Sequence, residues 1–209
     1  MTEVRRAGPD DWAQVREICC ETGDAGEPID RERWRFFGEF WVGPYQLLAP
    51  AWTFVALREG RVVGYLNGCP ASLSFYFRRL LSHRPRLAAA ALAGRYGSTV
   101  DTRRFLNPWE GVKRNLAVRF GPRLYARLLH RYRAHLHTNV RAGLRGAGVG
   151  RAVMESYLGQ LRAAGVGGVH LFCGARPVPF YRRLGFHVMA RVETGKGPVF
   201  AMARRLPKK

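Results

Sequence analysis

A run of small residues between two patterned segments constrains this chain more than any other feature of its sequence. The run reads Leu144-Arg145-Gly146-Ala147-Gly148-Val149-Gly150-Arg151. Before it, residues 134–140 alternate as in a half-exposed strand, and after it apolar residues recur at helical spacing over 148–164. The positions on that helical face are Val149, Val153, Tyr157 and Leu161. The pattern therefore predicts a strand, a sharp turn and a helix.

Such a turn can hold an anion. Glycine lets the backbone approach a phosphate without an intervening side chain, and the free N–H groups of a helix start point into one concavity. The flanking Arg145 and Arg151 could add charge-assisted hydrogen bonds to the same ligand. Tight packing of a helix on a sheet also selects glycine, so the turn by itself leaves a purely structural interpretation open.

Two well-known phosphate loops do not fit these residues. A Walker loop needs Gly-Lys-Ser or Gly-Lys-Thr, where this chain has Gly150-Arg151-Ala152. A dinucleotide-binding fold places its loop after the first strand and an acidic residue about 20 positions later. Here the loop follows Val140, and residues 168–172 contain no acid. Both classes are excluded.

Length and composition set the broad class. With 209 residues, 47% hydrophobic and 24% charged, the chain is long enough for one substantial folded domain, 1–209. It has no apolar run of about 20 residues and no secretory h-region, so we expect no membrane partner and a cytoplasmic location. Its four cysteines lack metal-site spacing, so we expect reduced thiols and no metal. They are Cys19, Cys20, Cys69 and Cys173.

The remaining periodicities predict a regular order of elements. We expect strands at 3–6, 52–57, 61–66, 169–173, 186–191 and 199–204, and helices from Trp12, over 29–40 and over 177–184. The second helix is expected to end at the turn-like Val42-Gly43-Pro44-Tyr45. Glu59-Gly60 between two β-prone runs predicts a hairpin.

Residues 71–133 differ from the rest of the chain in composition. Arginines and aromatic residues alternate there, and the segment carries 14 Lys or Arg against two acidic residues, a net charge of +12 out of +20 for the chain. Leucine spacing predicts helices, with Pro85, Pro108 and Pro122 as breakers. A positive charge of this size attracts polyanions, but it does not indicate whether the ligand is nucleic acid, acidic lipid or nucleotide phosphate.

Two motifs together resemble the Gcn5-related N-acetyltransferase (GNAT) superfamily. Arg145-Gly146-Ala147-Gly148-Val149-Gly150 is similar to its Arg/Gln-x-x-Gly-x-Gly/Ala signature, and Phe180-Tyr181-Arg182-Arg183-Leu184-Gly185-Phe186 to its carboxy-terminal half. The resemblance covers 134–186 and, more loosely, the first 70 residues. It implies an α/β fold with a mixed, mostly antiparallel sheet, splayed between its fourth and fifth strands, with helices on both faces and a basic helical insertion at 71–133.

The resemblance also implies a binding site for acetyl-CoA as cosubstrate. The amides of Gly146, Ala147, Gly148, Val149 and Gly150 would hold the pyrophosphate, with Arg145 and Arg151 beside them, and Thr138, Asn139 and Val140 would line the pantetheine arm. Tyr181 would protonate the departing thiolate. For the base that deprotonates the amine, His137 is the first candidate, beside Asp24, Asp101 and Glu110. The link 174–179 is shorter than usual and lacks the asparagine that many relatives have.

A closer likeness is to the acetyltransferase-like domain of O-GlcNAcase and its bacterial counterparts. It rests on Thr22-Gly23-Asp24-Ala25-Gly26, Val42-Gly43-Pro44-Tyr45, the long insertion and His135-Leu136-His137. We expect acetyl transfer to an amine of a small molecule or protein, with Trp41, Tyr45, Phe75, Tyr76 and Trp109 lining the acceptor pocket. The alternatives are a non-catalytic acyl-CoA-binding module and, ranked lowest, a nucleic-acid-binding protein. A homodimer is left open.

Overall fold

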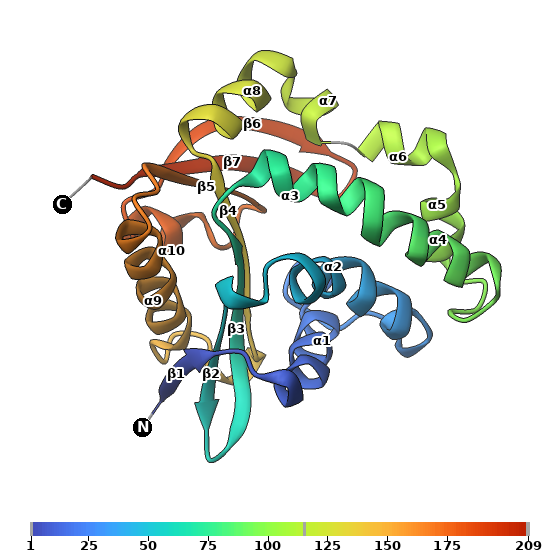
Figure 1. The fold of residues 1–209 in the computed structure, drawn as a ribbon, viewed down its shortest axis with the longest axis horizontal. Helices are drawn as coiled ribbons and strands as arrows, with labels where there is room; N and C mark the ends of the chain where they lie inside the picture. The colour runs from blue at the N-terminus through green and yellow to red at the C-terminus, as the bar shows by residue number, and fades with distance from the viewer. Residues whose placement is uncertain (1, 115, 208–209) are drawn as a thin grey trace.

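The structure, a computed structural model, contains one seven-stranded sheet (Figure 1). It describes residues 2–114 and 116–207. The strands are β1 (Glu3–Arg6), β2 (Thr53–Arg58), β3 (Arg61–Cys69), β4 (Ala134–Val140), β5 (Gly168–Cys173), β6 (His187–Thr194) and β7 (Gly197–Arg205). All seven were expected from the sequence; β1 and β4 have the predicted bounds, and the other five extend beyond a predicted end by one to three residues.

The sheet is mixed and mostly antiparallel, as expected. Its order is β1-β2-β3-β4-β5-β7-β6, and only β4 and β5 pair in parallel. That parallel pairing is confined to Ala134 with Val169 and His135 with His170. Beyond His135 the two strands separate, so the predicted splay between the fourth and fifth strands is confirmed.

The turn between β2 and β3 shows how local chemistry fixes the sheet. Glu59 and Gly60 both have positive φ, +50° and +74°. Two such residues form the two-residue turn whose twist matches that of paired strands, and glycine supplies one of them without strain. The hairpin predicted from Glu59-Gly60 is therefore confirmed.

Helices cover both faces of the sheet (Figure 1). On one face, α1 buries Trp12, Val15 and Ile18 against β2 and β3, and α2 lies beside α1. On the other face, α9 packs the predicted stripe of Val149, Val153, Tyr157 and Leu161, each at most 1% exposed. The helices are α1 (Trp12–Glu21), α2 (Trp34–Leu48), α3 (Ser72–Arg78), α4 (Arg84–Leu92), α5 (Val100–Leu106), α6 (Pro108–Arg114), α7 (Leu116–Phe120), α8 (Pro122–Arg131), α9 (Val149–Ala163) and α10 (Val178–Arg183).

Two predicted helix ends are wrong for the same reason. The segment Val42-Gly43-Pro44-Tyr45 lies inside α2, and Pro85 lies inside a helical run that continues from 72 to 92. The run is continuous because a π-helix, η4 (Arg79–His83), joins α3 to α4. A proline removes one helical hydrogen bond and crowds the preceding turn. Tertiary packing can offset that cost, whereas sequence periodicity does not report it.

Candidate functional site

We refer to the main-chain amides of residues 146–150, in the loop after β4 and the first turn of α9, as the ring of amides. Gly146 and Gly148 have φ of +87° and +80°, which glycine adopts without strain. Within the described part of the chain, no main-chain carbonyl accepts from the amides of Gly146, Gly148, Val149 or Gly150. The amide of Ala147 differs, because it donates to the carbonyl of Leu144 at 3.3 Å. Four of the five amides expected to hold a pyrophosphate are thus free to donate.

The glycines of this region divide between packing and binding. A Cβ on Gly64 would lie 2.9 Å from Val149 Cγ1, so this glycine allows close contact between β3 and α9. A Cβ on Gly150 would lie 3.4 Å from Phe180 Cζ, so this glycine faces α10. A Cβ on Gly146 or Gly148 would meet open space. The positive φ explains glycine at these two positions, and packing of the helix on the sheet does not account for it.

The two arginines of the loop are held by other groups. Arg145 donates to the carbonyl of Gly26 and lies 3.9 Å from the carboxylate of Glu27. Arg151 is exposed and forms an i,i+4 ion pair with Glu155 at 2.8 Å. Helix-surface pairs of this kind contribute only about 0.3–0.5 kcal/mol, so Arg151 can exchange partners easily. Whether either arginine reaches a phosphate stays a prediction.

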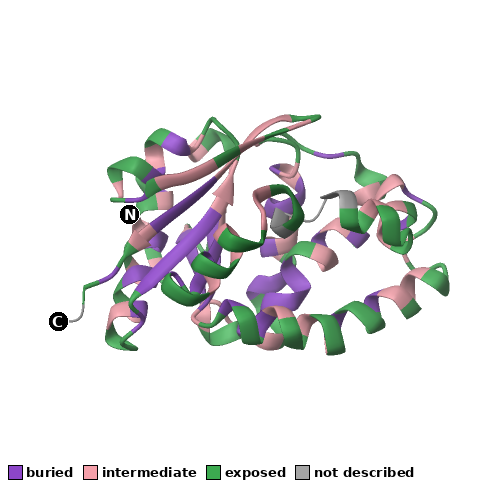
Figure 2. Cartoon of the chain, turned by 90° about the horizontal axis from the view of Figure 1, so that it is seen from above, coloured by how far each residue is buried: buried purple, intermediate pink, exposed green. Residues whose placement is uncertain are grey.

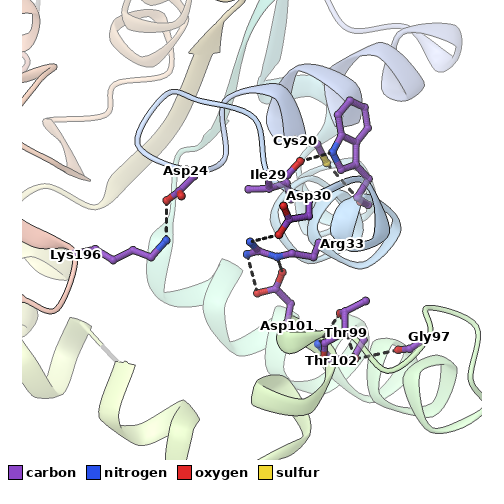
Figure 3. Close-up of polar contacts among 11 residues, drawn as sticks. Cys20, Asp24, Ile29, Asp30, Arg33, Gly97, Thr99, Asp101, Thr102 and Lys196 are labelled. Carbon is purple, nitrogen blue, oxygen red and sulfur yellow. Dashed lines mark hydrogen bonds and ion pairs between the residues drawn. The ribbon is translucent and has the colours of Figure 1, made fainter.

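The loop after α1 is tied to three elements around the splay. Asp24 accepts from Lys196 Nζ at 2.7 Å, across to the turn between β6 and β7 (Figure 3). Glu27 lies 3.5 Å from Arg176, in the link between β5 and α10. At the start of α2, Arg33 Nε donates to Asp101 of α5 at 2.7 Å (Figure 3). These contacts join the first loop, the insertion and the carboxy-terminal half of the sheet at one end of the splay.

The pairing of β4 with β3 shows which residues of β4 direct their main-chain groups to its free edge. Arg141 donates its amide to the carbonyl of Val63 at 3.0 Å, which makes that antiparallel pair a hydrogen-bonded one. Such pairs alternate along the strand, so Asn139 directs its main-chain groups toward β3. Thr138 and Val140 direct theirs toward the splay. The three residues expected along the pantetheine arm therefore differ. Thr138 and Val140 have main-chain groups at the free edge of β4, whereas those of Asn139 are directed toward β3.

Polar side chains fix this part of β4. Thr138 Oγ1 donates to the carbonyl of Tyr65 at 2.6 Å, and Asn139 Nδ2 donates to the hydroxyl of Tyr65 at 3.0 Å. Burial raises the pKa of Tyr65 well above its ordinary value, so this hydroxyl stays protonated. Both bonds hold β4 against β3, which leaves the opposite edge of β4 in a defined position.

Tyr181 lies on α10 and is 6% exposed, between Phe180 and Phe186. No described residue forms a hydrogen bond with its hydroxyl. Burial, with a smaller contribution from nearby Cys173, raises its pKa above the ordinary value for a phenol. The phenol is therefore neutral at physiological pH, and its ring is part of the aromatic packing with Phe180 and Phe186.

His137 lies between Trp41 and Tyr65, whose rings are each 5.9 Å from its own. Burial lowers the pKa of His137 to about 4, so its imidazole is neutral at pH 7. Its Nδ1 is buried without a partner among the described residues. Trp41, at the edge of this arrangement, is 41% exposed, so one side of the cluster reaches solvent.

His135 is a structural residue. Because residues two apart on a strand share a face, His135 and His137 both lie on the α2 side, where they contact Tyr45 and Trp41. Ser72 Oγ donates to the carbonyl of Arg133 at 2.6 Å, so His135 Nδ1 donates to that hydroxyl at 2.8 Å. Tyr76 stacks on the imidazole with a 5.0 Å centroid separation.

The remaining candidates for a base are less available. The pKa of Asp24 is lowered, chiefly by its hydrogen bond with Lys196, and Asp101 is bound by two nitrogens of Arg33. Glu110 lies on α6.

The aromatic residues expected to line an acceptor pocket do not lie together. Tyr45, Phe75 and Tyr76 surround His135 in the core, and Trp109 is 76% exposed. Of the five aromatic residues, Trp41 alone contacts His137.

The described residues contain no group of three or more His, Cys, Asp or Glu side chains that could hold a metal ion. None of their helices is both long and apolar enough to span a membrane.

Comparison with known proteins shows the fold. No protein-family model matches the chain. The structure named SsHAT is 28% identical, with a TM-score of 0.70, over 98% of both chains. A GCN5-related N-acetyltransferase from Kribbella flavida is 17% identical, with a TM-score of 0.55, over 98% of both chains. A polyamine N-acetyltransferase from Drosophila melanogaster, which catalyses formation of N-acetylagmatine, is 18% identical, with a TM-score of 0.59, over 99% of this chain and 100% of that one. The expected GNAT fold is confirmed.

Proposed function

We propose that this protein is an N-acetyltransferase that moves an acetyl group from acetyl-CoA to an amine. The observation that carries the proposal is the ring of free amides at Gly146, Gly148, Val149 and Gly150, at the open end of the β4–β5 splay. A helix N-terminus with free amides favours an anion, and the +20 charge of the chain favours it further. No side chain fills the space above Gly146 and Gly148.

Acetyl-CoA would supply an activated thioester, and the protein would supply position and proton transfer. The amides of the ring would bind the pyrophosphate, with Ala147 contributing if its bond to Leu144 opens. Main-chain groups of Thr138 and Val140 would bind along the splay, while the side chain of Asn139 holds Tyr65 in place. Arg145 and Arg151 would add charge where they exchange Gly26 and Glu155 for phosphate.

Tyr181 and His137 are proposed as the catalytic pair. The raised pKa of Tyr181 means that its phenol holds a proton at pH 7, so Tyr181 is in the form that can give a proton to the departing sulfur. His137 is unprotonated at pH 7 and can accept a proton from the amine. Its lowered pKa makes His137 a weak base. It would therefore act on an amine that is already uncharged, or receive the proton of the amine through water.

The acceptor is proposed to be a neutral or acidic molecule bearing an amine. A net charge of +20 repels polycationic acceptors. Within the superfamily we place the chain in the subgroup related to the acetyltransferase-like domain of O-GlcNAcase, as one domain over 1–209 with the 71–133 insertion. A non-catalytic acyl-CoA-binding module shares the ring of amides and differs only in turnover.

A matched pair of glycine variants tests the proposal. Isothermal titration with acetyl-CoA should show binding to the wild-type protein and at least tenfold weaker binding to Gly148→Ala, because a side chain at φ +80° strains the ring. Gly143→Ala is the control, since Gly143 lies one turn away with ordinary φ and open space around it. No heat with wild type would overturn the proposal. Binding without thiol release across a panel of amines would favour the non-catalytic module.

A further inference from the structure

The helix that opens the insertion carries an apolar stripe with no partner. From 72 to 92 the chain is continuously helical, and Leu73, Phe77, Leu80 and Leu81 project from one side of it. These side chains are 60%, 61%, 56% and 62% exposed. Four large apolar side chains in contact with water on one helix exceed the scattered exposure that soluble surfaces normally show.

The stripe is not needed to attach this helix to the fold. A different side of the helix buries Phe75, His83 and Leu87, and Phe75 packs on Tyr45 of α2 with ring centroids 4.8 Å apart. Arg79 adds a hydrogen bond to the carbonyl of Phe40. Seen from above, the helices of the insertion extend beyond the buried sheet and are largely exposed (Figure 2). The stripe is therefore available to another surface.

The charge of the same helix indicates what kind of partner surface it can bind. Residues 72–92 contain four arginines and no acidic residue. Arg78, Arg84 and Arg86 are exposed, and in the described parts of the chain no carboxylate lies within 4.0 Å of their guanidinium groups. Arg84 instead lies over the ring of Phe105 at 5.1 Å. The exposed part of this helix thus carries both apolar and cationic side chains, and no described carboxylate neutralises its three exposed arginines.

We propose that the helix 72–92 docks on anionic phospholipid membranes. The four apolar side chains would enter the boundary between headgroups and acyl chains, and the arginines would bind lipid phosphates, as in interfacial amphipathic helices. This goes beyond acetyl transfer and does not depend on it. It revises the expectation of no membrane partner, which considered only spanning segments.

Two other occupants fit the surface less well. A second copy of this chain would bring the +12 charge of one insertion against that of another. Nucleic acid would satisfy the arginines, but leucine side chains neither stack on bases nor bind phosphate, so burying the stripe would gain little. An anionic lipid surface satisfies both components at once.

Co-sedimentation of the full chain with vesicles tests the proposal. We expect binding to phosphatidylcholine vesicles that contain about 30% phosphatidylglycerol, little binding to phosphatidylcholine alone, and weaker binding as salt increases. Leu81→Asp should lower the partition coefficient about tenfold, because it removes one inserted side chain and adds a repelled charge. Leu47→Asp is the matched control: Leu47 is 43% exposed on α2, and the change of residue and charge is the same.

Several results would overturn the proposal. One is no binding to anionic vesicles; another is an equal loss in Leu81→Asp and Leu47→Asp, with both variants melting like the wild type. If light scattering shows that the wild type is a dimer, that Leu81→Asp is a monomer, and the wild type does not bind vesicles, the stripe would be assigned to self-association. Binding of duplex DNA or single-stranded RNA that Leu81→Asp abolishes would assign it to nucleic acid. Acetyl-CoA titration of Leu81→Asp should match the wild type, which keeps this test separate from that of the proposed function.

Discussion

Arg79 Nη2 donates a hydrogen bond of 2.9 Å to the carbonyl of Phe40. In a regular helix that carbonyl would accept from residue 44, but Pro44 has no N–H. The guanidinium also lies 4.8 Å above the ring of Phe40. An arginine from the insertion thus satisfies the acceptor that a proline leaves open in α2, next to Trp41 at the candidate site.

The first prediction is a coupling between Arg79 and Pro44. Arg79→Met leaves the Phe40 carbonyl without a donor, a loss of about 1–3 kcal/mol for a buried group, partly offset by removing a half-buried charge. Pro44→Ala restores an N–H that can bond to this carbonyl, so Arg79→Met should cost less in that background, by about 1 kcal/mol. Urea unfolding of the four proteins measures the coupling. An identical cost of Arg79→Met in both backgrounds would contradict the assignment.

The second prediction contrasts two glycines. A Cβ on Gly68 of β3 would lie 2.1 Å from Tyr157 Cε2, and the Tyr157 hydroxyl is fixed by bonds to Cys69 and to the carbonyl of His135. Gly68→Ala should therefore destabilise the fold by several kcal/mol, of order 3. Gly159→Ala, in the interior of α9 with open space around it, should stabilise by about 0.5–1 kcal/mol. Thermal melts of both variants decide; a shift of the same sign in each would refute this account.

The third prediction concerns Tyr181. Loss of a proton donor to the leaving thiolate should lower kcat of Tyr181→Phe by about 10²–10⁴-fold, with acetyl-CoA affinity little changed. Tyr96→Phe is the control, because Tyr96 packs edge-on against Phe36 of α2 and plays no part in the proposed site. Steady-state thiol release measures kcat. Unchanged kcat with wild-type stability would restrict Tyr181 to packing.

The fourth prediction is a loss of stability in mild acid. Burial lowers the pKa of His137 and His170 to about 4, and that of His135 well below its ordinary 6.5. Between pH 6.5 and 4 the unfolded chain binds more protons than the folded one, so the unfolding free energy falls as pH falls. Each such histidine contributes a slope of up to about 1.4 kcal/mol per pH unit.

Urea unfolding between pH 7.5 and 4.5 measures this slope. His170→Asn should reduce it, whereas His130→Asn, at an exposed position of α8, should leave it unchanged. A second loss should follow at lower pH as Glu39 is protonated, because its hydrogen bond with His83, opposed by burial and aided by Arg16, lowers its pKa to about 2. Stability independent of pH down to 4.5 would mean that the buried histidines titrate normally.

The sequence by itself determined the positions of the strands, the helix α9 and the sharp turn between β4 and α9. Alternation along β4, helical spacing from Val149 to Leu161 and glycine at 146 and 148 each reflect a local rule: the period of a strand, the period of a helix, and the positive φ that glycine tolerates. The side of the strand on which a residue falls follows from the same period, which is why His135 and His137 share a face.

Only the tertiary structure decided how distant groups satisfy one another. The carbonyl that Pro44 leaves without a helical donor is met by Arg79, 35 positions later, and Arg145 donates to the carbonyl of Gly26 in the first loop. The aromatic residues around His135 form core because four segments converge there. Hydrogen bonds and burial of this kind are set by positions in space, so no periodicity along the chain reports them.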